Sequence, residues 1–156
     1  MPGTFIDTSA ILDGWVRYYP PDTFPGLWER IDELIENGHL RATEEVLHEL
    51  EKKDDDVHAW AKERKESLFV PIDDQIQPAV ATILENFEKL VDTRRNRSAA
   101  DPFVIALAQI QSCIVVTGEG ATGNLDRPNI PDVCTALGVP CVGLLKMIRS
   151  EGWTFS

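Results

Sequence analysis

The chain has 156 residues, of which 43% are hydrophobic and 26% charged, and its formal net charge at pH 7 is −11. This length fits one domain, residues 1–156, with a core of its own, and no apolar run is long enough for a membrane-spanning helix. Proteins that neutralise many nucleic-acid phosphates are expected to be basic. The acidic surplus therefore leaves three possibilities. Nucleic acid is not a partner, or it contacts only a local basic patch and metal ions held among the carboxylates, or the partner is a basic protein.

The three cysteines, Cys113, Cys134 and Cys141, are odd in number and show no C-x-x-C spacing. We expect them to be reduced thiols in a cytoplasmic protein, and no signal-like segment precedes the first expected strand. The three histidines have no metal-ligand spacing with each other or with the cysteines, so no zinc site is predicted.

The first stretch, residues 4–7, reads as a short buried strand that ends on Asp7 and turns directly into Thr8 and Ser9. A strand that is apolar on both faces is typical of parallel α/β sheets, whose carboxyl edge is where ligands bind. Asp7 is therefore a candidate site residue. The alternative is that Asp7 only caps the short helix expected over residues 9–16.

Alternating apolar patterns and turn residues predict the remaining elements. Further strands are expected at residues 39–42, 68–71, 113–117 and 139–143. Further helices are expected at residues 24–36, 44–53, 55–66, 73–92, 98–111, 130–138 and 144–150. This alternation predicts an α/β fold in which a five-stranded parallel sheet carries helices on both faces.

Other acidic residues are expected at the same edge of the sheet as the first strand's acid. Ser98 and Asp101 form a capping box that opens an apolar helix, and this helix runs back to feed the strand 113–117. Its N-terminus must then lie at the carboxyl edge, where Glu119 also follows its strand. Glu49 lies on the second turn of a helix that leaves the second strand, roughly 9 Å along its axis, and Thr43 is expected to cap that helix.

Four converging acids repel one another unless a cation lies among them. With no zinc-type ligands, the expected cation is Mg²⁺ or Mn²⁺, which serves phosphoryl chemistry by orienting phosphate and activating water. Nearby hydroxyl groups are expected to bond the water or the substrate, and these are Thr8, Ser9 and Thr117. The densest basic cluster, Arg94, Arg95 and Arg97, either clamps substrate phosphates or forms a solvated loop.

Four motifs, in this order and spacing, resemble those of the PIN-domain ribonucleases over essentially the whole chain. They are Asp7-Thr8-Ser9, Glu49-Leu50, the run over residues 100–108 and the run over residues 114–119. Within that superfamily the chain is most similar to a PIN-like group known as DUF4411, with which the run over residues 130–134 is also shared.

The resemblance implies a Mg²⁺- or Mn²⁺-dependent endoribonuclease that cuts single-stranded RNA. It also implies the toxin of a VapBC-type toxin–antitoxin pair, which forms a homodimer and is inhibited by a cognate antitoxin protein. Carried over by motif, the catalytic, metal-binding acids would be Asp7, Glu49, Asp101 and Glu119.

One position departs from the family pattern, because Glu119 stands where an Asp usually follows Thr-x, which puts a second metal ion in doubt. Glu45 shares a helix face with Glu49 and is an alternative ligand. Two other functions remain open: a non-catalytic PIN-like module whose acidic cleft binds a basic side chain of a partner, and a phosphatase with Asp7 as nucleophile. The phosphatase usually needs a second Asp where this chain has Ser9.

Trp15 and Trp28 are expected to be core or subunit-contact residues rather than a platform for stacking bases. The candidates for a dimer interface are Trp15, Trp28 and Trp153.

Overall fold

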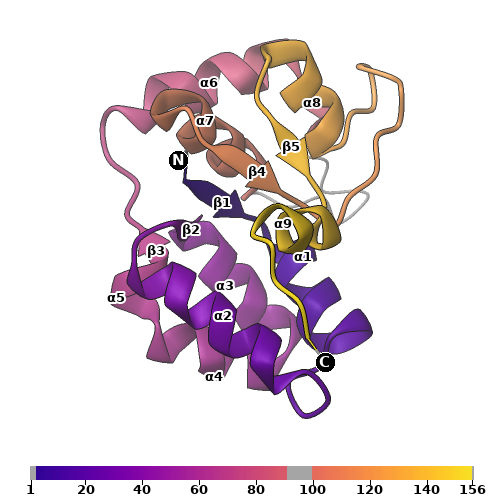
Figure 1. Cartoon of the computed structure of the whole chain (residues 1–156). Helices are drawn as coiled ribbons and strands as arrows, with labels where there is room; N and C mark the ends of the chain where they lie inside the picture. The colour runs from indigo at the N-terminus through magenta and orange to yellow at the C-terminus, as the bar shows by residue number, and fades with distance from the viewer. Residues whose placement is uncertain (1–2, 91–99, 156) are drawn as a thin grey trace.

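The computed structural model describes residues 3–90 and 100–155. Five strands form a parallel sheet in the order β3-β2-β1-β4-β5 (Figure 1), as the sequence predicts. The strands are β1 (Thr4–Ile6), β2 (Leu40–Thr43), β3 (Phe69–Val70), β4 (Ile114–Val116) and β5 (Cys141–Val142). Each strand lies inside its predicted range or within one residue of it.

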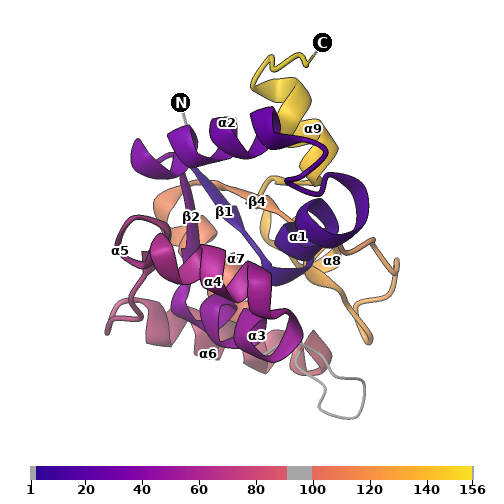
Figure 2. The ribbon, with the colours of Figure 1, turned by 90° about the horizontal axis from the view of Figure 1, so that it is seen from below.

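Helices connect the strands and cover both faces of the sheet. They are α1 (Thr8–Leu12), α2 (Pro25–Glu36), α3 (Glu44–Lys53), α4 (Asp55–Glu63), α5 (Lys65–Leu68), α6 (Ile76–Asn86), α7 (Asp101–Gln111), α8 (Ile130–Leu137) and α9 (Leu144–Ser150). On one face, α7 contacts β1, β2 and β4 and is flanked by α6 and α8. On the other face lie α1, α2 and α9 (Figure 2), where Ile11, Trp28 and Leu144 surround one small apolar space with Ile6 of β1.

The central strand β1 lies where the strand order reverses. The chain moves outward from β1 to β2 and β3, returns through α6 and α7, and adds β4 on the other side of β1. Phe5 and Ile6 point to opposite faces and both are buried, as expected for a strand between two helical layers. The carboxyl ends of β1 and β4 therefore flank the position where open α/β sheets bind their ligands.

The tryptophans predicted as core or contact residues pack within the chain. The ring centroids of Trp15 and Trp28 are 5.0 Å apart, and those of Trp28 and Trp60 are 5.4 Å apart, in edge-to-face arrangements. Trp28 is buried, and Trp15 and Trp153 are partly buried against the core. Trp28 is thus a core residue, and a dimer interface at these positions stays a prediction.

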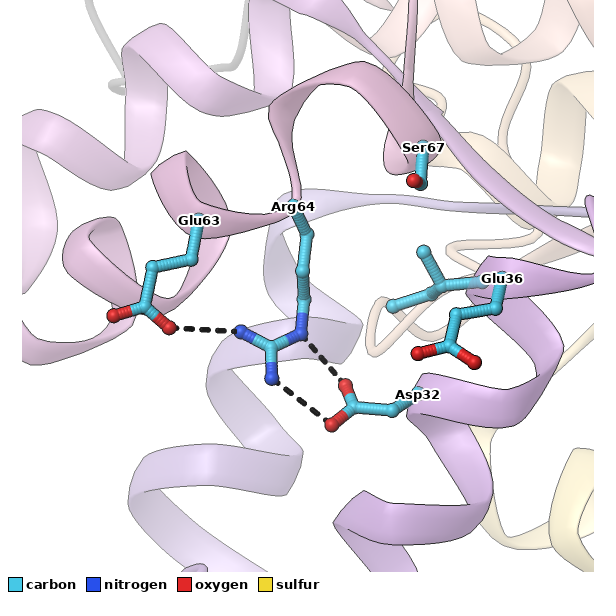
Figure 3. A pocket seen from close by; sticks show the side chains of 6 residues that line it. Asp32, Glu36, Glu63, Arg64 and Ser67 are labelled. Atoms are coloured by element: carbon cyan, nitrogen blue, oxygen red, sulfur yellow. Dashed lines mark hydrogen bonds and ion pairs between the residues drawn. The ribbon is translucent and has the colours of Figure 1, made fainter.

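The predicted helix over residues 55–66 is interrupted at Arg64, which separates α4 from α5. The Arg64 guanidinium donates to both carboxylate oxygens of Asp32 on α2, at 2.6 and 2.9 Å, and lies 4.9 Å from the Trp60 ring centre. Figure 3 shows this pair at a surface pocket of about 250 Å³, which Glu36, Glu63 and Ser67 also line. The interruption lets Arg64 reach across to α2 and tie the two segments together.

The predicted helix over residues 73–92 is wrong in extent, because α6 spans Ile76–Asn86 and a short 3₁₀ turn, Glu88–Leu90, follows it. Asp73 accepts hydrogen bonds from the backbone of Gln75 and Ile76, which holds the first residues in a turn. At the other end the chain leaves the helix so that Phe87 and Leu90 enter the core.

Side-chain caps are predicted from the sequence for the helices α3 and α7. Thr43 occupies the N-cap position of α3, but its side chain makes no capping hydrogen bond, so that prediction is wrong in its chemistry. The capping box falls partly on Ser98, which lies outside the described residues; α7 begins at Asp101, after Ala100.

Within residues 3–90 and 100–155, no helix combines the length and apolar character needed to cross a bilayer.

Candidate metal centre

Asp7 follows β1 directly and is 2% exposed. One carboxylate oxygen accepts the backbone N–H of Ala10 at 2.8 Å, so Asp7 does cap α1. The other accepts the Thr117 hydroxyl at 2.6 Å, and the Ser9 hydroxyl lies 2.9 Å from both oxygens. Residues from the β1–α1 turn and from the end of β4 therefore fix this carboxylate in one orientation.

Three of the four predicted acids come together around this point. Asp7, Asp101 and Glu119 each offer a carboxylate oxygen, and these oxygens all lie within 4.8 Å of one another. Asp101 is the buried first residue of α7, and Glu119 is half-buried in the loop after β4. Their convergence follows from topology, because the carboxyl ends of β1 and β4 and the N-terminus of α7 meet at one edge of the sheet.

Glu49 is not a member of this three-residue cluster, but it is tied to its margin. The Thr8 hydroxyl, next to Asp7 in the chain, donates to Glu49 Oε1 at 2.5 Å. Within the described part of the chain, no hydrogen bond links Glu45 to these residues. The contact with Thr8 therefore favours Glu49 over Glu45 as the acid of α3 that faces the site.

The pKa of Asp7 shows that placing negative charge in this cluster is unfavourable. On balance the pKa is raised from 3.8 to about 7: burial raises it most and the negative charge of Glu119 also raises it, whereas the hydrogen bonds from Thr117, Ala10 and Ser9 lower it. Near neutral pH the site must hold either a proton on Asp7 or a cation among the three carboxylates. This donor set consists of hard oxygen ligands, which fit Mg²⁺ or Mn²⁺.

Glu119 is held by the elements on either side of its loop. Its backbone N–H donates to Thr117 Oγ1 at 3.1 Å, and its Oε1 accepts the backbone N–H of Ile130, the first residue of α8, at 3.0 Å. The Glu119 side chain, one methylene longer than that of an Asp, is thereby anchored at the N-terminus of a helix, where negative charge is favoured.

The sequence-based reasoning missed Asp13 and Arg17. Arg17 Nη1 donates to Asp13 Oδ1 at 3.0 Å, and the Arg17 side chain is 69% exposed. A Cβ atom added at Gly118 would lie 2.1 Å from Asp13 Oδ2, so Asp13 packs directly on the residue before Glu119. The i,i+4 spacing predicts the Asp13–Arg17 pair, but no sequence signal places it against Gly118.

Of the predicted substrate-binding residues, Thr8, Ser9 and Thr117 all lie at the cluster, bonded to its acids or to Glu49. Arg94, Arg95 and Arg97 lie outside the described residues. The three cysteines are free thiols, as predicted.

The sheet order and the acidic cluster at its carboxyl edge define a PIN-like α/β domain. Residues 5–155 match the family described as "Domain of unknown function (DUF4411)", and the chain belongs to that family. The resemblance to the DUF4411 group read from the sequence motifs is thereby confirmed.

Solved structures of other proteins are similar in fold. The structure of FitAB bound to an IR36 DNA fragment matches with 16% identity over 90% of this chain and 94% of that chain, at a TM-score of 0.50. FitAcB from Neisseria gonorrhoeae matches with 18% identity over 89% of this chain and 96% of that chain, at a TM-score of 0.51. No curated protein matches the chain. At these identities the likeness shows the fold alone.

Proposed function

We propose that this protein is a metal-dependent endoribonuclease that hydrolyses phosphodiester bonds of single-stranded RNA with Mg²⁺ or Mn²⁺. The observation that carries the proposal is the convergence of Asp7, Asp101 and Glu119 within 4.8 Å at the carboxyl edge of a PIN-like sheet. Three ionised carboxylates in a largely buried position raise the free energy of the folded chain unless a cation lies among them. Mg²⁺ or Mn²⁺ bound by carboxylates is common in enzymes that catalyse phosphoryl transfer.

In such a site some residues would bind the metal ion and others would orient its ligands and the attacking water. Asp7, Asp101 and Glu119 would hold the ion, and Glu49 would act from the Thr8 side, as a ligand or by orienting water. A divalent ion bound there supplies the positive charge that orients a phosphate and lowers the pKa of an attacking water. Asp7 releases its proton when the cation binds, and the hydroxyls of Ser9 and Thr117 keep its carboxylate oriented.

RNA binding by a chain of net charge −11 requires local cations. Arg17 meets this need, because Asp13 anchors it beside the loop that carries Glu119 while its side chain stays exposed. A guanidinium in this position can contact a substrate phosphate with two donors. The cluster Arg94, Arg95 and Arg97 remains a second proposed contact.

The biological setting that we propose is a toxin–antitoxin pair in the cytoplasm, with this chain as the toxin, acting as a homodimer that a cognate antitoxin protein inhibits. The fold likeness to the FitAB assembly supports a protein partner. The net charge of −11 also suits a basic partner segment.

The test is incubation of the purified protein with labelled single-stranded RNA, double-stranded RNA and matched DNA, in Mg²⁺ or Mn²⁺. We expect the parent to cut single-stranded RNA, Asp101→Asn to be inactive, and Asp126→Asn, which changes an exposed acid of the β4–α8 loop, to cut like the parent. Equal activity of Asp101→Asn and the parent would refute the assignment.

A second candidate, favoured by the net charge of −11, is a non-catalytic PIN-like module whose acidic cleft receives an Arg or Lys side chain of a partner protein. If the folded protein cuts none of the substrates and also fails to bind Mn²⁺, this candidate is supported over the nuclease.

A further inference from the structure

The loop between β4 and α8, residues 117–129, is organised around one buried carboxylate, Asp132, on the first turn of α8. Asp132 Oδ1 accepts the backbone N–H groups of Thr122, at 3.0 Å, and Gly123, at 2.9 Å. Its Oδ2 accepts the backbone N–H and the hydroxyl of Thr122, at 2.9 and 3.0 Å, and the backbone N–H of Asn129 at 2.8 Å. Asp132 thus joins the middle of the loop to the start of the helix.

An ionised carboxylate suits this arrangement, because the three backbone N–H groups that face its two oxygens can only donate, and the Thr122 hydroxyl can donate as well. Burial alone would raise the pKa of Asp132, but the hydrogen bonds from Thr122, Asn129 and Gly123 outweigh it and lower the pKa to about 2. The side chain is therefore charged at any pH at which the protein would work.

The same loop carries an acid of the proposed metal centre. Glu119 stands at the start of the loop, and its Oε1 accepts the backbone N–H of Ile130, at the loop's other end, at 3.0 Å. Asn129 adds a further tie across the loop, because its side-chain amide donates to the carbonyl of Gly120 at 2.8 Å. Ile130 can hold Glu119 in place only if the loop keeps the first turn of α8 next to the end of β4.

We propose that Asp132 is a positioning residue of the metal centre: by tying the loop to the first turn of α8, it keeps Glu119 oriented toward Asp7 and Asp101. This proposal rests on the proposed function, since it assumes that the three clustered acids bind a divalent cation. The shared run over residues 130–134 thereby receives a physical role, although Asp132 itself lies outside the three-acid cluster.

Asp132→Asn is the informative substitution, because it preserves the size of the side chain but replaces one acceptor oxygen with an amide donor. Whichever way the amide is turned, its NH₂ group faces at least one N–H group, so the loop loses hydrogen bonds and must shift. Asp126→Asn is the matched control, since it makes the same chemical change on an exposed residue of the same loop.

The experiment is a titration of the full chain with Mn²⁺, in which the electron paramagnetic resonance signal measures the concentration of free ion. It is carried out at a temperature well below the melting point of every variant. We expect the parent and Asp126→Asn to bind with equal dissociation constants, and Asp132→Asn to bind at least about 10-fold more weakly. A purely structural role would lower the melting temperature of Asp132→Asn and leave the dissociation constant of the folded protein unchanged.

Equal Mn²⁺ affinity in the parent and in folded Asp132→Asn overturns the proposal and leaves the proposed function intact. Failure of the parent to bind Mn²⁺ overturns both, so the two failures are distinguishable. If Asp132→Asn does not fold, Thr122→Val removes the hydroxyl donor to Asp132, together with the contacts of that hydroxyl with Asn124, and we expect a smaller but measurable weakening. Unchanged affinity in that variant contradicts the proposal.

Discussion

Replacing Asp7 with Asn should stabilise the metal-free protein at pH 8, although it removes a proposed metal ligand. The pKa of Asp7 is 3.8 in its ordinary state and about 7 in the folded chain, chiefly because the carboxyl group is buried. Between these two values the folded state holds a proton that the unfolded state has released. The resulting stability is fully present below pH 3.8 and is lost as the pH rises through 7.

The size of the effect follows from the two pKa values. At about 1.36 kcal/mol per pKa unit, ionising Asp7 in the folded metal-free chain costs about 4 kcal/mol at pH 8. Asn carries no charge at any pH, but its NH₂ group cannot accept the hydrogen bond that Thr117 donates to Asp7, which costs about 1 kcal/mol. The net gain of about 3 kcal/mol corresponds to a rise in melting temperature of roughly 6–12 °C for a chain of this size.

The assay is thermal unfolding in EDTA at pH values from 4 to 8, for the parent, Asp7→Asn and the control Asp126→Asn. The difference in melting temperature between a variant and the parent isolates the substituted group, since the other groups titrate in both proteins. We expect this difference to grow with pH for Asp7→Asn and to stay near zero for Asp126→Asn. A difference that does not change with pH, or a less stable Asp7→Asn at pH 8, would refute the reasoning.

Three further predictions concern the ion, the loop and the substrate. Mn²⁺ should raise the melting temperature of the parent more at pH 8 than at pH 5.5, because the ion must displace the proton of Asp7, and Asp7→Asn should show no such pH dependence; an equal rise in the parent at both pH values would contradict the cluster as the binding site. Gly118→Ala should destabilise the chain by about 1–3 kcal/mol in thermal unfolding, because the added Cβ would lie 2.1 Å from Asp13 Oδ2, and an unchanged melting temperature would show that Asp13 moves away without cost. Arg17→Gln should raise KM for RNA several-fold and leave the Mn²⁺ dissociation constant unchanged, and the increase in KM should be smaller at high salt. An unchanged KM would show that Arg17 does not contact the substrate.

The parts of the site that were predictable from the sequence are those fixed by backbone topology. A buried apolar run ending in Asp7 and another ending near Glu119 indicate two parallel strands, and the apolar helix that begins at Asp101 must run back across the sheet to feed the second of them. These three acids then meet at one edge of the sheet whatever their rotamers. For this reason the sequence predicted their convergence, and the structure confirms it.

The parts that were not predictable depend on contacts between side chains distant in sequence. Whether Glu49 or Glu45 faces the site depends on the bond from Thr8, which a helix period alone does not fix. Asp13 meets Gly118 across more than 100 residues of chain, and nothing local to either residue signals the contact. The end of α6 at Asn86 likewise follows from burial of the next side chain, Phe87, in the core, which outweighs the helical pattern that continues beyond it.

The most direct test of the central claim is RNA cleavage measured before and after metal removal, on the parent and on Asp7→Asn purified in parallel. The account predicts that the parent cuts single-stranded RNA, that excess EDTA abolishes cleavage, and that added Mn²⁺ restores it in the parent while Asp7→Asn stays inactive throughout. Cleavage that survives EDTA, or that Asp7→Asn performs as fast as the parent, would contradict a metal centre built on Asp7, Asp101 and Glu119.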